Sequence, residues 1–204
     1  MNKTKLRLSL LLLGSIALGS CSRSGGNEFT AEGTITDAAG KTLYLETTDT
    51  DEPQLIDSVT LDEKGRFRFR REAHSYPAFY RLRLGESFIP FAADSVTHLS
   101  LSASGKDLFS TYKIESGDEA NKQIREIGQL RTATDKAIEA ILTQLNNGTL
   151  DRGVALARID SLSTQLKNTL TSKYIFNDPK GAAAYYALFQ SYLGGTYFSI
   201  DHPG

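Results

Sequence analysis

Apolar and polar residues alternate in short runs from residue 29 to residue 115, and residues typical of tight turns separate the runs. Alternation with a period of two predicts half-buried strands, because successive side chains of a strand point to opposite faces of the sheet. Short strands joined by tight turns are typical of an antiparallel β-sandwich or open barrel. The predicted strands are Phe29–Thr36, Thr42–Thr47, Gln54–Leu61, Arg66–Glu72, Ala78–Leu84, Phe88–Ala92, Thr97–Ala103 and Thr111–Glu115.

From residue 116 onward the apolar residues recur at intervals of three and four, which is the spacing of a helix with one buried face. Ser116 and Glu119 have the spacing of a capping box, in which each residue bonds the backbone of the other, so we expect the first helix to begin there. Asn146-Asn147-Gly148 predicts its end.

A second apolar stripe begins at Leu150 and Val154 and continues to Tyr174, and the short loop before it predicts an antiparallel pair of helices. Asn177-Asp178-Pro179 predicts the start of a third helix over Lys180–Leu193, which two glycines end. The whole pattern predicts an α+β fold, with an antiparallel β-sandwich or open barrel over residues 28–115 and a three-helix lobe over residues 116–204.

Cys21 is the only cysteine of the chain and follows a segment typical of a secretory signal. Basic residues precede an apolar run over Leu8–Leu18, which is too short to cross ~30 Å of hydrocarbon as a helix. The sequence Leu18-Gly19-Ser20-Cys21 resembles the lipobox of bacterial lipoproteins, although Gly19 departs from the commonest residues at its position. The resemblance implies that residues 1–20 are a signal peptide and that Cys21 carries the lipid. The alternative is a free thiol near an ordinary secretory cleavage site.

The lipobox also implies an address for the protein. Two or three palmitate-type acyl chains on Cys21 would anchor it stably to a membrane, and residues 21–27 are polar enough to serve as a flexible tether. No aspartate follows the cysteine, which in lipoproteins favours the outer membrane over retention in the inner membrane. We therefore expect a lipoprotein of the cell envelope in the outer membrane facing the periplasm, with a surface-facing position as the alternative.

Charge and motifs exclude several classes of function. Residues 1–20 hold three of the 23 basic residues and none of the 24 acidic ones, so the remainder carries a formal charge of −4, which argues against a nucleic-acid partner. His74, His98 and His202 lack the spacing of metal ligands, so no metal site is predicted. No nucleophile elbow, phosphate-binding loop or dinucleotide fingerprint occurs, so the sequence predicts no catalytic residue and no cofactor.

Arginine gathers in two of the predicted strands. Arg66, Arg68 and Arg70 alternate with phenylalanines in one strand, and Arg81 and Arg83 lie in the next. If these two strands pair, the five arginines share one face of the sheet and form a candidate binding face for an acidic partner or a lipid phosphate. The alternative, which we prefer, is a solvated face whose arginines pair with acidic residues on neighbouring strands.

A series of short motifs runs through the strand region, in the order in which a known family has them. That region resembles the N-terminal domain of unknown function that precedes thioredoxin-like domains in bacterial thiol–disulfide interchange lipoproteins, and the helical region resembles the helices that follow that domain. The matching segments are Phe29-x-x-x-Gly33, Gly40-x-x-Leu43-Tyr44-Leu45, Ile56-Asp57-Ser58, Gly65-x-Phe67-x-Phe69, Pro77-x-x-Tyr80-x-Leu82 and Phe88-Ile89-Pro90-Phe91.

The chain departs from this family where the redox chemistry lies. Family members that exchange disulfides carry Trp-Cys-x-x-Cys on a later domain, and this chain has no tryptophan and no cysteine besides Cys21. The first hypothesis is therefore a non-catalytic, lipid-anchored accessory module with a protein partner in the envelope. The second is a truncated or split oxidoreductase whose thioredoxin-like domain lies beyond Gly204, because the aromatic-rich C-terminal section suggests relatives that continue. The third is a structural envelope lipoprotein without a redox link.

Overall fold

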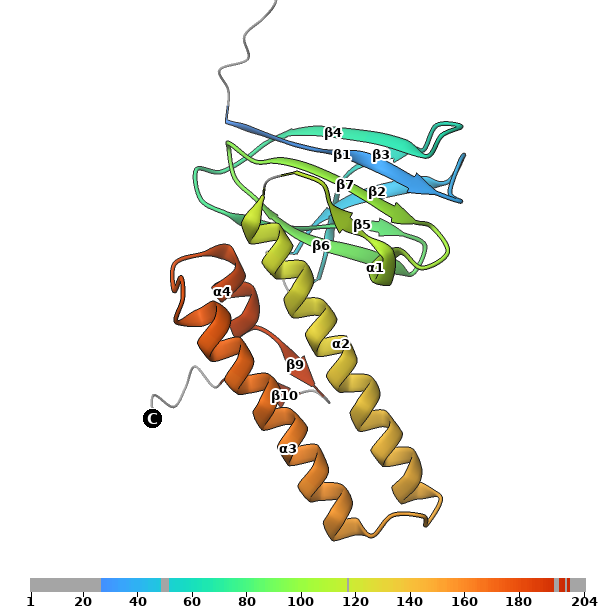
Figure 1. Cartoon of the computed structure of the whole chain (residues 1–204). Helices are drawn as coiled ribbons and strands as arrows, with labels where there is room; N and C mark the ends of the chain where they lie inside the picture. Colours follow the sequence, from blue (N-terminus) through green and yellow to red (C-terminus); the bar gives the residue numbers. More distant parts are fainter. Residues whose placement is uncertain (1–26, 49–51, 117, 193–194, 197, 199–204) are drawn as a thin grey trace, which may run out of the picture.

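A computed structural model describes residues 27–48, 52–116, 118–192, 195, 196 and 198 of the chain (Figure 1). The predicted signal peptide and Cys21 lie outside the described residues. The N-terminal part consists of two four-stranded sheets, a first sheet with the order β4-β1-β7-β8 and a second sheet with the order β3-β2-β5-β6. The strands are β1 (Glu28–Thr36), β2 (Thr42–Thr47), β3 (Gln54–Thr60), β4 (Arg66–Glu72), β5 (Ala78–Leu84), β6 (Ser87–Ala93), β7 (His98–Ser104) and β8 (Lys113–Ile114).

The two sheets pack face to face and enclose the larger of two hydrophobic cores. Alternate residues point inward in strands such as β5, where Ala78, Tyr80, Leu82 and Leu84 are buried. Aromatic rings fill the centre: the ring centroids of Phe29 and Tyr80 lie 4.8 Å apart. The predicted sandwich and its strand positions are therefore present.

One strand pair differs from the antiparallel pattern that the sequence predicts. Strand β1 pairs antiparallel with β4 on one side but parallel with β7 on the other. The two strands are far apart in the chain, so no hairpin constrains their relative direction. The predicted last strand is also shorter, because residues 108–111 form a helical turn, α1 (Leu108–Thr111), before β8 begins.

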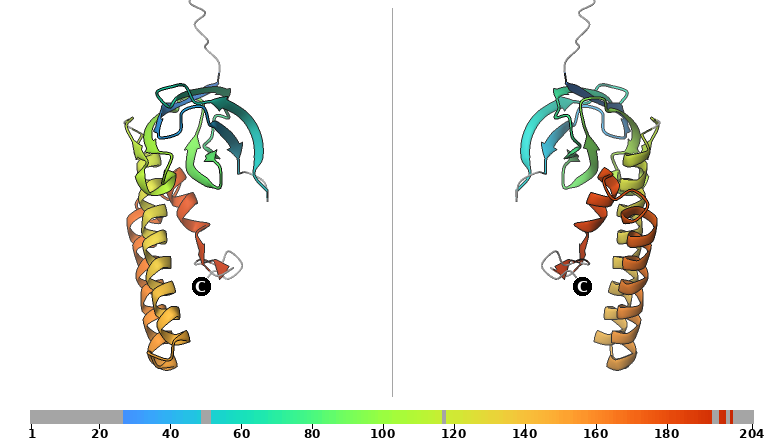
Figure 2. Two further views of the ribbon diagram at one scale, coloured as in Figure 1. Left: turned by 90° about the vertical axis from the view of Figure 1, so that its right-hand side faces the viewer. Right: turned by 90° about the vertical axis from the view of Figure 1, so that its left-hand side faces the viewer.

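The helical region forms a long antiparallel hairpin that projects from the sandwich as an arm (Figures 1 and 2). Helix α2 (Glu119–Asn146) leaves the sandwich, and helix α3 (Arg152–Leu170) returns to it. Helix α3 continues into a π-helical segment, η1 (Thr171–Ile175), which is followed by the short helix α4 (Ala182–Leu188). Two short strands, β9 (Ser191–Tyr192) and β10 (Gly195–Thr196), pair after it.

The second core joins the helices to the sandwich. Ile124 and Ile127 of α2, Leu170 of α3 and Ala187 of α4 pack together with Ala92 of β6. Ala92 faces away from the sandwich core, so the helices cover part of the outer face of the second sheet. Among the described helices, none combines the length and the apolar character that a membrane span requires.

Three details of the predicted helices are wrong. Asp118, and not Ser116, caps α2: its side chain accepts a hydrogen bond from the Asn121 backbone at 2.9 Å, while the Ser116 hydroxyl accepts one from the Ser100 backbone at 3.4 Å. Helix α2 begins only at Glu119, and the residue directly before the first turn is the one whose side chain reaches its free N–H groups.

The other two errors concern α4 and α3. Helix α4 is shorter than predicted, because a backbone hydrogen bond from Gly181 to Asp178 forms a turn before it and the chain leaves the helix after Leu188. In α3 the apolar stripe is displaced at the far end of the arm. Ala155 is buried there, whereas Val154 is 44% exposed.

Candidate binding surfaces of the sheets and the helix junction

The five arginines of the predicted binding face do not share a face. Strand β4 lies at the edge of the first sheet and β5 lies inside the second, so the two strands do not pair and the expectation of one common face is wrong. The chain crosses from the second sheet to the first after β3 and returns after β4. The outer face of the first sheet holds Arg66, Arg68 and Arg70, and the outer face of the second holds Arg81 and Arg83.

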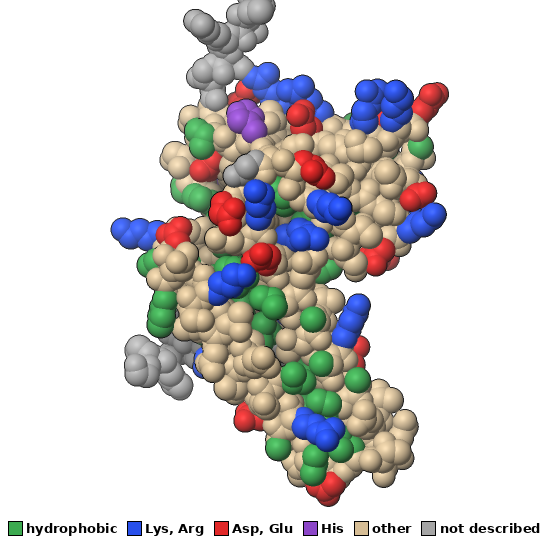
Figure 3. All heavy atoms as spheres, viewed as in Figure 1, with side chains coloured by type: hydrophobic (Ala, Val, Ile, Leu, Met, Phe, Trp, Pro, Cys, Tyr) green, Lys and Arg blue, Asp and Glu red, His purple; other side chains and the backbone are tan. Residues whose placement is uncertain are grey.

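The three arginines of the first sheet each contact a carboxylate. Arg66 pairs with Asp62 at 2.7 Å, Arg68 with Glu32 at 3.4 Å and Arg70 with Glu28 at 2.6 Å. At least half of each arginine side chain stays exposed to solvent. Figure 3 shows basic and acidic side chains interspersed over the sandwich. These contacts favour the solvated-face interpretation for the first sheet, since exposed pairs contribute little energy.

The two arginines of the second sheet form a tighter cluster around a residue that the sequence analysis did not single out. The Nε atom of Arg81 donates to one carboxylate oxygen of Glu46 at 2.6 Å, and Nε of Arg83 donates to the other at 2.7 Å. The guanidinium of Arg81 lies over the Phe88 ring and that of Arg83 over the Tyr44 ring, with 5.1 and 4.4 Å to the centroids. Only 5% of Glu46 is exposed.

The charge of this cluster is well defined. Burial alone would raise the pKa of Glu46, but the hydrogen bonds from Arg81 and Arg83 outweigh it and hold the pKa below the ordinary value of 4.5. Glu46 is therefore ionised at neutral pH, and the two guanidiniums retain one positive charge between them. Sequence alternation places Glu46 on the outer face of β2, but it does not predict that β2 pairs with β5.

Aromatic side chains continue this surface from the second sheet onto α4. Phe79 of β5 stacks on Tyr185 and Tyr186, with ring centroids 5.7 and 6.2 Å away. Tyr185 and Phe189 remain 55% and 50% exposed. In the described part of the aromatic-rich C-terminal section, some rings thus pack against the sheet and others are exposed to solvent.

A buried asparagine fixes the helices to the edge of the second sheet. The side chain of Asn121 accepts a hydrogen bond from the Ala92 backbone N–H and donates one to the Ala92 carbonyl, both at 2.8 Å. Strand β6 is an edge strand, so Asn121 takes the place of a neighbouring strand at this residue. Arg125 adds a hydrogen bond to the Tyr112 carbonyl. The junction is thus held by specific polar contacts as well as by the second core.

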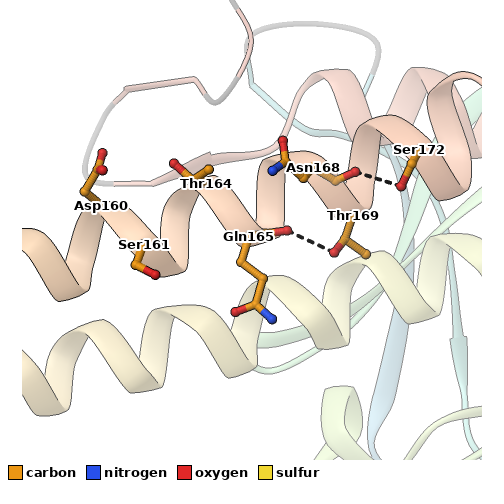
Figure 4. A pocket seen from close by; sticks show the side chains of 7 residues that line it. All are labelled: Asp160, Ser161, Thr164, Gln165, Asn168, Thr169 and Ser172. Atoms are coloured by element: carbon orange, nitrogen blue, oxygen red, sulfur yellow. Dashed lines mark hydrogen bonds between the residues drawn. The ribbon is translucent and has the colours of Figure 1, made fainter.

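A hollow of about 680 Å³ lies along α3 (Figure 4). Its lining comes from α3 and the start of η1, and two of its hydroxyl groups donate to backbone carbonyls of α3: Thr169 to the Gln165 carbonyl and Ser172 to the Asn168 carbonyl. Polar side chains along one helical face do not point toward a common ligand position. In the described part of the chain, no group of three or more His, Cys, Asp or Glu side chains is arranged to hold a metal ion.

Comparison with known proteins does not place the chain in a family. No model of a known protein family matches the chain, and no curated protein matches it.

Proposed function

We propose that the protein is a lipoprotein of the bacterial cell envelope, anchored through a lipid on Cys21, and that its α+β body is a non-catalytic binding module. The observation that carries the proposal is the lipobox-like sequence Leu18-Gly19-Ser20-Cys21 behind a short apolar run with basic residues before it. The chain has no tryptophan and no second cysteine, so it has no counterpart of the Trp-Cys-x-x-Cys motif found in the family that it resembles.

The outer face of the second sheet supports a binding role with a protein partner. Arg81 and Arg83 share a single carboxylate, the Arg81 guanidinium lies over Phe88, and Tyr185 and Phe189 of α4 expose large apolar area. Arginine and aromatic side chains are the residues that most often carry the energy of protein interfaces. An envelope protein with acidic and apolar groups on its surface is the partner that this combination fits.

Replacing Cys21 tests the anchor. Cells that express the wild-type chain or Cys21→Ala are fed radiolabelled palmitate, and the protein is then fractionated between membrane and soluble pools. We expect the wild type to take up label and to sediment with the membranes, and Cys21→Ala to take up none, because it lacks the sulfur that is acylated.

The matched control is Ser24→Ala, a change of similar size in the predicted tether, which keeps the label. Absence of label in the wild-type protein would disprove the lipoprotein proposal.

A further inference from the structure

A pocket of about 320 Å³ lies where the sandwich, α2 and the end of α4 meet. Its walls include four aromatic rings, those of Phe88, Phe109, Tyr186 and Phe189, which come from three separate parts of the fold. Its volume lies at the lower end of the range for small-molecule sites, about 300–1,000 Å³. Four rings favour a flat apolar group in the ligand, and the other lining residues, which are all polar or charged, favour a polar group on it.

One cation lines this aromatic pocket. Arg131 of α2 donates from Nη1 to Asp135 at 2.9 Å, and in the described part of the chain Asp135 is its only hydrogen-bond acceptor. A guanidinium has five N–H donors, so most of those of Arg131 remain for a ligand. An anionic group beside Arg131 would accept charge-assisted hydrogen bonds, which are stronger than those between neutral groups.

The ion pair of Arg131 and Asp135 is itself incomplete. The Oδ1 atom of Asp135 is buried and has no hydrogen-bond partner among the described residues. Burial raises the pKa of Asp135, which means that its environment disfavours the negative charge. In the described part of the chain, Arg131 is thus held by Asp135 through a single hydrogen bond.

The rest of the pocket is built to hold its shape. Gln190 is buried, and its amide donates to the Tyr186 carbonyl at 2.8 Å, which fixes the turn at the end of α4. Tyr186 reaches α2 beside Gly128, where the ring of Phe109 also packs and a side chain would collide with it. Among the described residues that line the pocket, Glu86 is the one carboxylate, and it is exposed.

We propose that this pocket binds a small aromatic anion, with its ring between the phenylalanine rings and its acidic group on the guanidinium of Arg131. A cationic ligand, the usual occupant of an aromatic cage, would meet the positive charge of Arg131. The proposal deepens the binding role proposed above by naming a ligand class, and it rests on that role but not on the anchor. The anionic ring has two sources, a free aromatic acid or a peptide that ends in phenylalanine.

Isothermal titration calorimetry on the full chain in a mild detergent tests the pocket. The ligands are 3-phenylpropionate and its neutral analogue 3-phenylpropionamide, which share the ring and differ in charge. We expect the acid to bind at least about tenfold more tightly than the amide, which is the scale of one charge-assisted hydrogen bond. The peptide Gly-Gly-Phe, with a free or an amidated C-terminus, forms the second arm; tighter binding of the free peptide than of phenylpropionate identifies a polypeptide as the source.

Two variants and a control assign the effect to Arg131. Arg131→Gln should abolish the preference for the acid and leave the amide unchanged. Asp135→Asn should increase the preference severalfold, because it removes the competing carboxylate and keeps the cation. Arg68→Gln, the same loss of charge on the opposite sheet, should behave as the wild type does.

Three results would overturn the proposal: no binding of either ligand, a preference for the acid that survives Arg131→Gln, or no gain in Asp135→Asn. If circular dichroism shows that Arg131→Gln is unfolded, the test depends on Asp135→Asn alone, that is, on whether its preference for the acid over the amide increases. These outcomes are separate from the palmitate labelling, so the pocket and the anchor can fail independently.

Discussion

At Gly65 the backbone adopts a conformation that only glycine tolerates without cost. Its φ angle is +74°, and a Cβ atom added there would lie 2.0 Å from the carbonyl oxygen of Ile35. The contact arises because the backbone N–H of Ile35 donates to the Gly65 carbonyl at 2.8 Å, which brings the β3–β4 turn against β1. Two demands therefore fall on one residue, a left-handed conformation and room for a neighbouring backbone.

Gly65 and Gly40 allow these two demands to be separated. Gly40 has the same φ of +74°, but a Cβ atom there meets nothing within 4 Å. We expect Gly40→Ala to lower the free energy of unfolding by about 1 kcal/mol, which is the cost of the left-handed conformation. Gly65→Ala should lower it by more than about 3 kcal/mol, because backbone must move as well.

Urea unfolding monitored by circular dichroism measures the free energy of unfolding of both variants. Equal losses in the two alanine variants would mean that the β3–β4 turn relaxes away from β1 without cost.

At the scale of the elements, Glu46 links β2 to β5 by a pair of hydrogen bonds that no local sequence pattern predicts. Its partners Arg81 and Arg83 lie 35 and 37 residues further along the chain. The carboxylate has a lowered pKa, so it stabilises the fold above the ordinary value of 4.5, and this contribution is lost as the pH falls through the lower pKa of the folded state.

Replacing Glu46 by glutamine should therefore cost stability only where the carboxylate is charged. At pH 7 we expect Glu46→Gln to lower the free energy of unfolding by about 2 kcal/mol, less than for a fully buried pair because both guanidiniums keep contact with water. The gap between wild type and variant should close as the pH falls below about 4.5 and through the lower pKa of Glu46 in the folded state. Denaturant titrations at several pH values measure it.

Glu32→Gln is the matched control, since Glu32 pairs with Arg68 on the exposed face of the first sheet. It should change stability by less than about 0.5 kcal/mol at any pH. A gap for Glu46→Gln that stays constant from pH 7 to the lowest pH at which both proteins remain folded would contradict the assignment.

Local patterns predict where the elements lie but not which elements meet. Period-two alternation gives β2 and β5 at their observed bounds, because each strand's own sequence determines which side is buried. The same alternation places Arg81 and Arg83 on the outer face of β5. It is silent on the pairing of β4 with β1 and of β5 with β2, so it could neither exclude a face shared by the five arginines nor predict the role of Glu46.

In the molecule as a whole, β6 connects the sandwich with the helical arm. Ile89 and Phe91 point into the first core, while Ala92 points into the second. Asn121 is 2% exposed and bonds both backbone groups of Ala92. The aromatic pocket also lies at this junction, and its residues come from distant segments. Sequence spacing cannot predict such a site, because its lining residues come from more than two elements that are distant in the chain.

Removing the Asn121 side chain should loosen this junction. In Asn121→Ala both backbone groups of Ala92 lose a buried partner, so we expect the free energy of unfolding to fall by about 2–3 kcal/mol. Amide hydrogen exchange should accelerate in the first turns of α2 more than in the sandwich core. Asn168→Ala on the exposed side of α3 is the control and should stay within about 0.5 kcal/mol of the wild type.

If amide hydrogen exchange accelerated equally across the whole chain, Asn121 would not specifically hold α2 against the sandwich.

The direction of the arm has a consequence for distance from the membrane. The first residues of β1 lie at the opposite end of the molecule from the turn between α2 and α3 (Figures 1 and 2). With a lipid on Cys21, the sandwich would lie close to the bilayer and the 28-residue helix α2 would extend away from it. At 1.5 Å per residue this helix is about 42 Å long. The anchored protein would then work as a spacer that presents its helical tip several nanometres from the lipid surface.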